Sequence, residues 1–211
     1  AAPTVAIAGD QCRDRDSQGI VRVTVADPEG TPVTVTATVS DPKLLERDGL
    51  LVSGTGSTRS VTVKTVPRST VQTGSITITA VDAAGTRTAQ TIGLIIGTKQ
   101  RDVIVGTDAP EMIFAMERDD DVSARGSGDL LCGGDGHDTL RGGDGDDVVD
   151  GEVEEDKLFG DAGADLLLGG AEDDTLTGGP GPDRFDGGSG RKDRAVDVNA
   201  AEGDTTTGIE R

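Results

Sequence analysis

Apolar and polar side chains alternate along residues 1–96 with the two-residue period of a β-strand. The alternation runs through six segments, at residues 3–8, 20–26, 32–39, 59–66, 74–81 and 88–96. Turn compositions separate them, including DPEG at 27–30, SGTGS at 53–57 and DAAG at 82–85. This pattern predicts an antiparallel β-sandwich over residues 1–96.

The sandwich pattern resembles bacterial immunoglobulin-like (Ig-like) or cadherin-like surface modules over about residues 3–96. The tryptophan and tyrosine landmarks of antibody-type domains are absent, since the chain has neither residue. The resemblance implies a spacer or adhesive unit, and no residue in this segment identifies a ligand.

From Gly97 the period becomes nine, and ten units start at 97, 106, 115, 124, 133, 142, 151, 160, 169 and 178. The sixth position of every unit is acidic: Asp102, Glu111, Asp120, Asp129, Asp138, Asp147, Asp156, Asp165, Asp174 and Asp183. The eighth position is always apolar: Ile104, Ile113, Val122, Leu131, Leu140, Val149, Leu158, Leu167, Leu176 and Phe185. Two such columns indicate a structural repeat.

Each unit is expected to make a turn followed by a short strand. The last three residues form the strand, with position eight facing inward and positions seven and nine facing outward. Glycines at positions one, two and four supply turn conformations that other residues reach only at a cost. Two units make one coil of eighteen residues, so turns stack on turns two units away. We therefore expect an all-β protein, with the antiparallel sandwich followed by a right-handed parallel β-roll over residues 97–211.

The central units, such as GGDGHDTLR at 133–141 and GGDGDDVVD at 142–150, resemble the repeat-in-toxin (RTX) nonapeptide G-G-x-G-x-D-x-U-x. The resemblance implies six-coordinate calcium ions between stacked turns, with one Asp and two carbonyls from each turn. For the turns at 142 and 160 it implies Asp147 with the carbonyls of Gly143 and Gly145, and Asp165 with those of Gly160 and Ala162. The other candidate ligands are Asp120, Asp129, Asp138, Asp156, Asp174 and Asp183.

Charge supports a cation at this place. The net charge of −19 falls on residues 97–211, which hold 30 acidic and 11 basic residues, whereas residues 1–96 hold 9 of each. Carboxylates stacked at the strand spacing of about 5 Å repel one another. Calcium suits the gap because it accepts carboxylates and carbonyls in flexible geometry, and magnesium is less suitable. The acidity also argues against nucleic-acid partners, and no apolar run is long enough to predict membrane insertion.

The repeats are uneven. The turns at 97, 106, 115 and 124 lack glycine at position four, so the first coils should bind weakly or act as a cap. Glu154 and Glu172 occupy the same position at 151 and 169, where we expect weaker binding or distortion. After Gly187 the segment GGSGRKD has one residue too many before Asp193, and the tail is expected to close the array.

Other kinds of site find little support. An EF-hand starting at Asp144 fails because Val148 and Val149 stand where an oxygen ligand and glycine belong. His137, the only histidine, is read as an exposed turn residue. Cys12 and Cys132 are compatible with a disulfide and equally with two free thiols. Hydrolase, metalloprotease and nucleotide-binding motifs are absent.

The sequence therefore predicts a secreted, non-enzymatic calcium-binding protein, and the start AAPTV fits the mature end left after signal cleavage. One alternative is a cell-surface adhesin whose sandwich binds a carbohydrate or protein partner. Another is a fragment of a larger exported enzyme. We expect calcium chelation to unfold residues 97–211 and to leave the sandwich folded.

Overall fold

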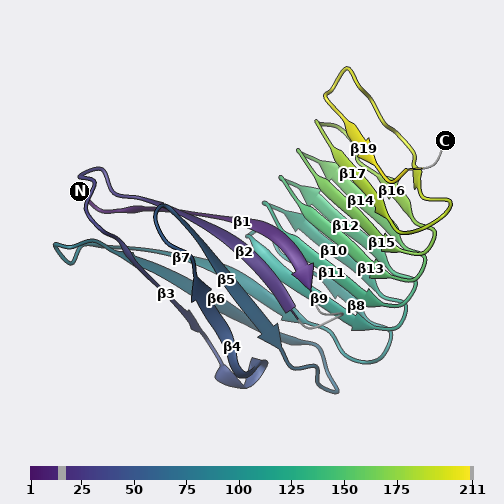
Figure 1. Cartoon of the computed structure of the whole chain (residues 1–211). Coiled ribbons are helices and arrows are strands. Elements are labelled where there is room, and N and C mark those ends of the chain that lie inside the picture. The colour runs from purple at the N-terminus through teal and green to yellow at the C-terminus, as the bar shows by residue number, and fades with distance from the viewer. Residues whose placement is uncertain (14–17, 210–211) are drawn as a thin grey trace.

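The computed structural model describes residues 1–13 and 18–209, and β-strands make up almost all of its regular structure (Figure 1). The exception is a short 3-10 helix, Pro42–Leu44, which Asp41 caps by accepting a hydrogen bond from the Lys43 N–H. The predicted all-β class is confirmed. No helix in the described part of the chain is long and apolar enough to cross a membrane.

The N-terminal region consists of two facing antiparallel layers. The first is a four-stranded sheet in the order β1-β2-β5-β4, with β1 at Thr4–Arg13, β2 at Gln18–Ala26, β5 at Thr58–Thr65 and β4 at Leu45–Ser53. The second contains β3 at Thr34–Val39, β6 at Gln72–Val81 and β7 at Arg87–Ile96, in the order β3-β6-β7. The sequence pattern missed β4, whose pairing with β5 is irregular between Leu45 and Leu50 and whose Asp48 has a φ of 61°.

The C-terminal half is a parallel β-roll with two sheets. One sheet contains β8 (Val103–Val105), β10 (Asp121–Gly126), β12 (Thr139–Asp144), β14 (Lys157–Ala162), β16 (Thr175–Thr177) and β18 (Arg194–Ala195). The other contains β9 (Glu111–Glu117), β11 (Leu130–Asp135), β13 (Val148–Val153), β15 (Leu166–Ala171), β17 (Arg184–Gly188) and β19 (Thr205–Thr207). Pairing of Leu131 with Val149 and of Leu140 with Leu158 confirms the coil of eighteen residues.

The sandwich and the roll share one continuous sheet. β7 pairs in parallel with β9, from Gly93 opposite Glu111 to Ile96 opposite Phe114. The order β3-β6-β7-β9-β11 therefore runs from the sandwich into the roll without a break, as Figure 1 shows. The first strands of the roll thus also extend the second layer of the sandwich.

Two apolar cores lie on opposite faces of this shared sheet. The core of the roll contains the whole eighth-position column, each member at most 3% exposed, which confirms its predicted inward direction. The core of the sandwich lies between the four-stranded sheet and the opposite face of the shared sheet. It includes five residues that point out of the roll at positions seven and nine, namely Met112, Phe114, Leu130, Cys132 and Val148.

Outward-facing side chains of the early coils are therefore buried, because β1 and β2 cover them. Met112 and Phe114 are fully buried, whereas the outward residues Val103 and Val105 on the other sheet are 72% and 51% exposed. Gly9 and Gly19 permit this close approach. A Cβ atom at Gly19 would lie 2.7 Å from the Met112 Cε, and one at Gly9 would lie 3.3 Å from the Leu130 Cβ.

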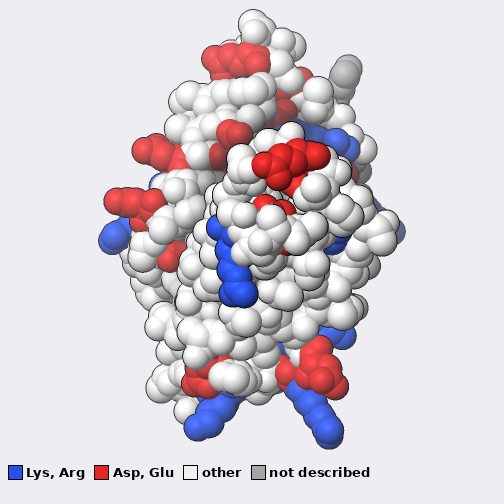
Figure 2. All heavy atoms as spheres, turned by 90° about the vertical axis from the view of Figure 1, so that its left-hand side faces the viewer, with Lys and Arg blue, Asp and Glu red and all other residues white. Residues whose placement is uncertain are grey.

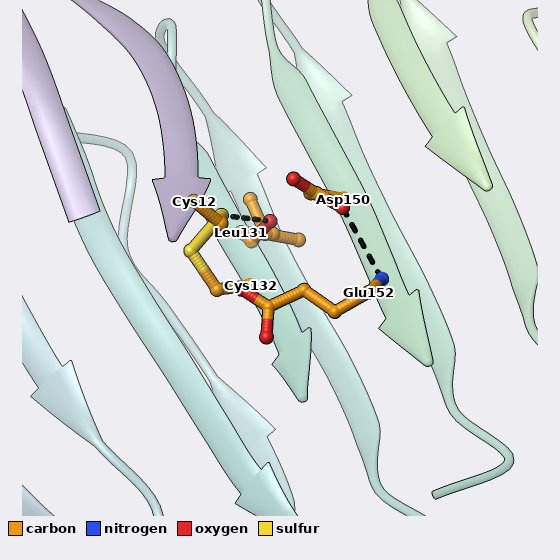
Figure 3. The surroundings of a disulfide bond; sticks show 5 residues. All are labelled: Cys12, Leu131, Cys132, Asp150 and Glu152. Atoms are coloured by element: carbon orange, nitrogen blue, oxygen red, sulfur yellow. Dashed lines mark hydrogen bonds between the residues drawn. A yellow bond between two sulfur atoms is a disulfide. The ribbon is translucent and has the colours of Figure 1, made fainter. Parts of the chain in front are cut away.

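A disulfide joins the two regions. Cys12, near the end of β1, is bonded to Cys132 on β11, and Figure 3 shows the bond between the two strands. The hypothesis of a disulfide is confirmed.

Candidate metal centre

The stacked turns carry a ladder of buried aspartates. In each coil, the Oδ1 atom of the sixth-position aspartate accepts a hydrogen bond from the backbone N–H of the sixth-position residue eighteen earlier. The distances are 2.6 to 3.0 Å for Asp120, Asp129, Asp138, Asp147, Asp156, Asp165, Asp174 and Asp183. All eight residues are at most 3% exposed. One carboxylate oxygen of each therefore serves the fold.

The second oxygen of seven of these eight carboxylates, and of Asp193, faces no protein donor. Within the roll, the Oδ2 atoms that are buried without a hydrogen-bond partner belong to Asp120, Asp129, Asp147, Asp156, Asp165, Asp174, Asp183 and Asp193. Unsatisfied buried polar atoms are rare in native proteins, and a repeated set of them indicates a site for an ion or another ligand. The ladder thus offers a row of carboxylate oxygens with the chemistry of a hard-cation site.

The first glycine of each turn makes room for this oxygen. A Cβ atom at Gly142 would lie 2.2 Å from the Asp147 Oδ2, and one at Gly160 would lie 2.3 Å from the Asp165 Oδ2. Glycine at position one therefore has a steric role, because a side chain would displace the carboxylate.

Burial makes these carboxylates hard to ionise without a cation. Desolvation raises the pKa of Asp147, Asp165 and Asp174 to about 7. The same cause raises the pKa of Asp120 and Asp129 to about 8 and that of Asp156 to about 10, and it raises the pKa of Asp183. Neighbouring carboxylates in the same row add to the effect. A bound cation would reverse it by neutralising the row.

Position four varies along the roll, and Gly136 has a φ of 144° whereas Ser127 has a φ of 77°. We call the turns at 106, 124, 142, 160 and 178 the first edge, and those at 97, 115, 133, 151, 169 and 187 the second edge. The first edge has glycine at 145, 163 and 181, with φ between 136° and 154°. On the second edge, Glu154 and Glu172 have φ of 74° and 79°. These two glutamates have a left-handed backbone conformation that residues with a side chain adopt only at a cost, and the expectation of weaker binding or distortion there stays a prediction.

The carbonyl ligands implied by the RTX resemblance lie in the expected turns. Gly143, with a φ of 114°, pairs with Asp161 on the adjacent strand, and Gly145 has a φ of 136°. The Ala162 carbonyl accepts a hydrogen bond of 2.7 Å from the Gly145 N–H. These turns are in direct contact, as a shared ion requires.

The carboxylates at three of the four ends of the two rows, Asp102, Glu111 and Asp204, are satisfied by the protein. The Asp102 Oδ2 accepts from the Thr98 N–H at 2.6 Å. Glu111 accepts from the N–H and hydroxyl of Thr107 at 2.8 and 2.9 Å. At the other end, the Asp204 Oδ2 accepts from the Asn199 N–H at 2.6 Å. These three residues have the role of caps.

Asp193 extends the ladder beyond the residues that the sequence pattern selected. It is 1% exposed, its Oδ1 accepts from the Asp174 N–H at 3.0 Å, and its Oδ2 is buried without a partner. The extra residue in GGSGRKD is accommodated in the turn, after which β18 pairs with β16 in parallel. The sequence signal for Asp193 is the GGSG segment at 187–190, and a repeat pattern that allows one inserted residue would have included Asp193.

Two other groups do not form a comparable site. Sulfur and oxygen atoms of Cys12, Cys132 and Glu152 lie within 4.8 Å of one another, but the disulfide occupies both sulfurs. His137 is exposed, and its Nδ1 atom lies 3.1 Å from the Glu155 carbonyl, which raises the pKa of the ring. On the face at the sandwich end, acidic and basic side chains are interspersed (Figure 2).

A comparison with protein-family models matches the same turns. The model for the RTX calcium-binding nonapeptide repeat, which spans four copies, matches residues 124–158, 133–167 and 159–191. Residues 124–191 are RTX calcium-binding repeats. The search of curated proteins found no match, and neither did the search of solved structures. The RTX segment therefore contains the ladder from Asp129 to Asp183, and the buried oxygens fit the calcium that this family binds.

Proposed function

We propose that this protein is a secreted, non-enzymatic calcium-binding protein whose roll folds when calcium binds between stacked turns. The observation that carries the proposal is the row of buried Oδ2 atoms without protein donors. Calcium would neutralise the negative charge of these buried carboxylates, and carbonyl oxygens of the turns would be its further ligands.

The chain's own residues explain why folding would depend on the ion. Each aspartate orders the preceding coil through its Oδ1, as Asp147 does with the Asp129 N–H. The same burial that permits this bond disfavours the charged carboxylate. At low calcium the charge opposes folding, and at higher calcium the folded state gains stability by mass action.

Secretion is supported by the disulfide as well as by the repeat family. Disulfides persist in oxidising compartments and are rare in the cytosol. Cys12 and Cys132 are both buried and bonded, so an extracellular location agrees with their state. External calcium would then act after export.

The N-terminal region fits the proposed Ig-like module. Its strand orders, β1-β2-β5-β4 and β3-β6-β7, correspond to the ABED and CFG sheets of a seven-stranded Ig-like sandwich. The alternative of an adhesive function is favoured by an open cavity of about 460 Å³ between the β2–β3 and β4–β5 loops, lined in part by Asp27, Thr31 and Arg59. Binding of a glycan array by the wild-type protein, lost in Arg59→Ala, would support adhesion.

Isothermal titration calorimetry of the whole protein with calcium, and separately with magnesium, tests the main proposal. We expect several calcium ions per chain and much weaker magnesium binding, because magnesium requires a tight octahedron and dehydrates reluctantly. Absence of calcium binding at neutral pH would contradict the proposal. Equal affinity for both ions would contradict the assignment of calcium.

A further inference from the structure

The first coil of the roll, residues 97–114, has the structure of a cap on the sandwich. Its two sixth-position carboxylates, Asp102 and Glu111, accept hydrogen bonds from Thr98 and Thr107. Its outward residues Met112 and Phe114 are fully buried in the sandwich core. Neither the charge nor the packing of this coil requires a cation.

The second coil, residues 115–132, is held against this cap by a covalent bond. Cys132, the last residue of the coil, is bonded to Cys12, and β1 crosses the coil at Gly9. Around the disulfide, the Cys12 Sγ lies 3.5 Å from the Leu131 carbonyl oxygen, and Asp150 of the third coil accepts a hydrogen bond from the Glu152 N–H (Figure 3). The second coil is also the first whose carboxylates, Asp120 and Asp129, have Oδ2 atoms without partners.

The other end of the roll offers a weaker platform. β18 has two residues, and all three residues of β19 are exposed. The partly buried apolar residues that pack there on the roll core are Ala195 and Ile209. The N-terminal cap instead contributes large buried side chains on both sides of the shared sheet.

We propose that residues 3–114 form a calcium-independent cap, and that calcium-driven coiling starts at the disulfide-linked second coil and proceeds toward the C-terminus. This inference rests on the proposed calcium function. It moves the calcium-dependent boundary from Gly97 to the start of the second coil.

The physical reason is that each repeat folds only against a neighbour. The disulfide keeps the second coil beside a folded surface, which raises the effective concentration of the coil at that surface. The pairs Asp120 with Asp138 and Asp129 with Asp147 then need only one further coil to complete their sites. A coil near β17 needs its preceding coils to be in place first.

Hydrogen exchange read by mass spectrometry across a series of free calcium concentrations tests the order. Peptides covering β2 and β9 should keep their protection in chelator. The calcium midpoint for protection should rise along β11, β13, β15 and β17. Hydrogen exchange can distinguish the coils because different segments of a protein unfold locally with different free energies.

Two variants of the full chain separate the disulfide from general packing. In Cys12→Ser/Cys132→Ser, the midpoint of β11 should rise by about tenfold or more, since a cross-link closing a loop of this length favours folding strongly. The order along the roll should then be lost. In the control Val148→Ala, packing under β1 is weakened but the disulfide remains, so the order should persist.

Three results would overturn the proposal while leaving calcium binding intact: a common midpoint for all four strands, earlier protection of β17 than of β11, or loss of β9 protection in chelator. An unchanged order in the double serine variant would show that the disulfide has no part in it. Calcium-independent protection throughout β11 to β17 would instead contradict the proposed function itself.

Discussion

Asp147 and Asp102 occupy the same repeat position but face different partners, which gives a direct test of the ligand assignment. The Asp147 Oδ2 is buried without a donor, whereas the Asp102 Oδ2 accepts from the Thr98 N–H. In both cases, asparagine retains the shape and an amide oxygen that can accept the structural hydrogen bond. The substitution therefore removes charge with little change in packing.

Asp147→Asn should weaken calcium binding far more than Asp102→Asn. Loss of a group that only supports a metal ligand costs about 10- to 100-fold in affinity, and loss of the ligand should cost at least as much. Asp147 lies between the turns at 124 and 160, so two ions would be affected. For Asp102→Asn we expect a change within about 0.5 kcal/mol, as for substitutions away from critical contacts.

Asp147→Asn should change the stability of the roll in opposite directions with and without calcium. Burial raises the pKa of Asp147 from 3.8 to about 7. At about 1.4 kcal/mol per pK unit, the ionised carboxylate therefore destabilises the folded roll at pH 8 by about 4 kcal/mol. Without calcium, the neutral asparagine should stabilise the folded roll by up to that amount. With saturating calcium it should destabilise the roll.

Calorimetric titration at pH 8 measures the affinities, and urea unfolding followed by circular dichroism measures the stabilities. Asp102→Asn is the matched control for both experiments. Equal affinity losses, or a larger loss for Asp102→Asn, would refute the reasoning that unpartnered Oδ2 atoms mark the ligands. An Asp147→Asn roll that is less stable than wild type without calcium would refute the electrostatic part.

Three further predictions follow from the same geometry. Without calcium, the roll should lose stability as the pH rises from about 4 to about 8, because its aspartates, including Asp156, have raised pKa values in the folded state. Saturating calcium should reverse this trend. Thermal melts at pH 4, 6 and 8 test it, and the same dependence of the melting temperature on pH with and without calcium would contradict it. Gly163→Ala should disrupt the roll, since Gly163 has a φ of 154° and a Cβ there would lie 1.8 Å from the Gly145 carbonyl oxygen. The control Gly56→Ala should lower the melting temperature much less, because Gly56 has a φ of 77° and no heavy atom beyond its chain neighbours lies within 4 Å of a Cβ placed there. Leu158→Ala should cost about 2 to 5 kcal/mol in urea unfolding with calcium present, and a loss no larger than that of exposed Val103→Ala would contradict the inward column.

Much of the roll could be predicted because the same residue types recur at the same repeat positions, where each coil has the same structural requirement. The acidic and apolar columns, two residues apart, give the buried ladder and the narrow core, and both are present. Asp193 was missed because one inserted residue shifts it out of a strict nine-residue register, although the backbone restores the stacking.

The union of the two regions was harder to predict, since it depends on contacts between segments far apart in the chain. The outward positions of the early coils contain only a partial signal. Met112, Phe114 and Leu130 are apolar and covered, but Val103 and Val105 at outward positions of the other sheet are apolar and exposed. The sequence alone did not show that β1 supplies the cover over the first three, nor that this crossing brings Cys12 to Cys132.

The central claim is that calcium binds at the unpartnered aspartate oxygens between stacked turns. The most direct measurement is anomalous X-ray scattering from crystals of the whole protein grown with calcium. Anomalous difference peaks should lie beside the Oδ2 atoms along both edges of the roll, including those of Asp147 and Asp165, and none should lie beside Asp102. An ordered roll without peaks at these oxygens would contradict the account.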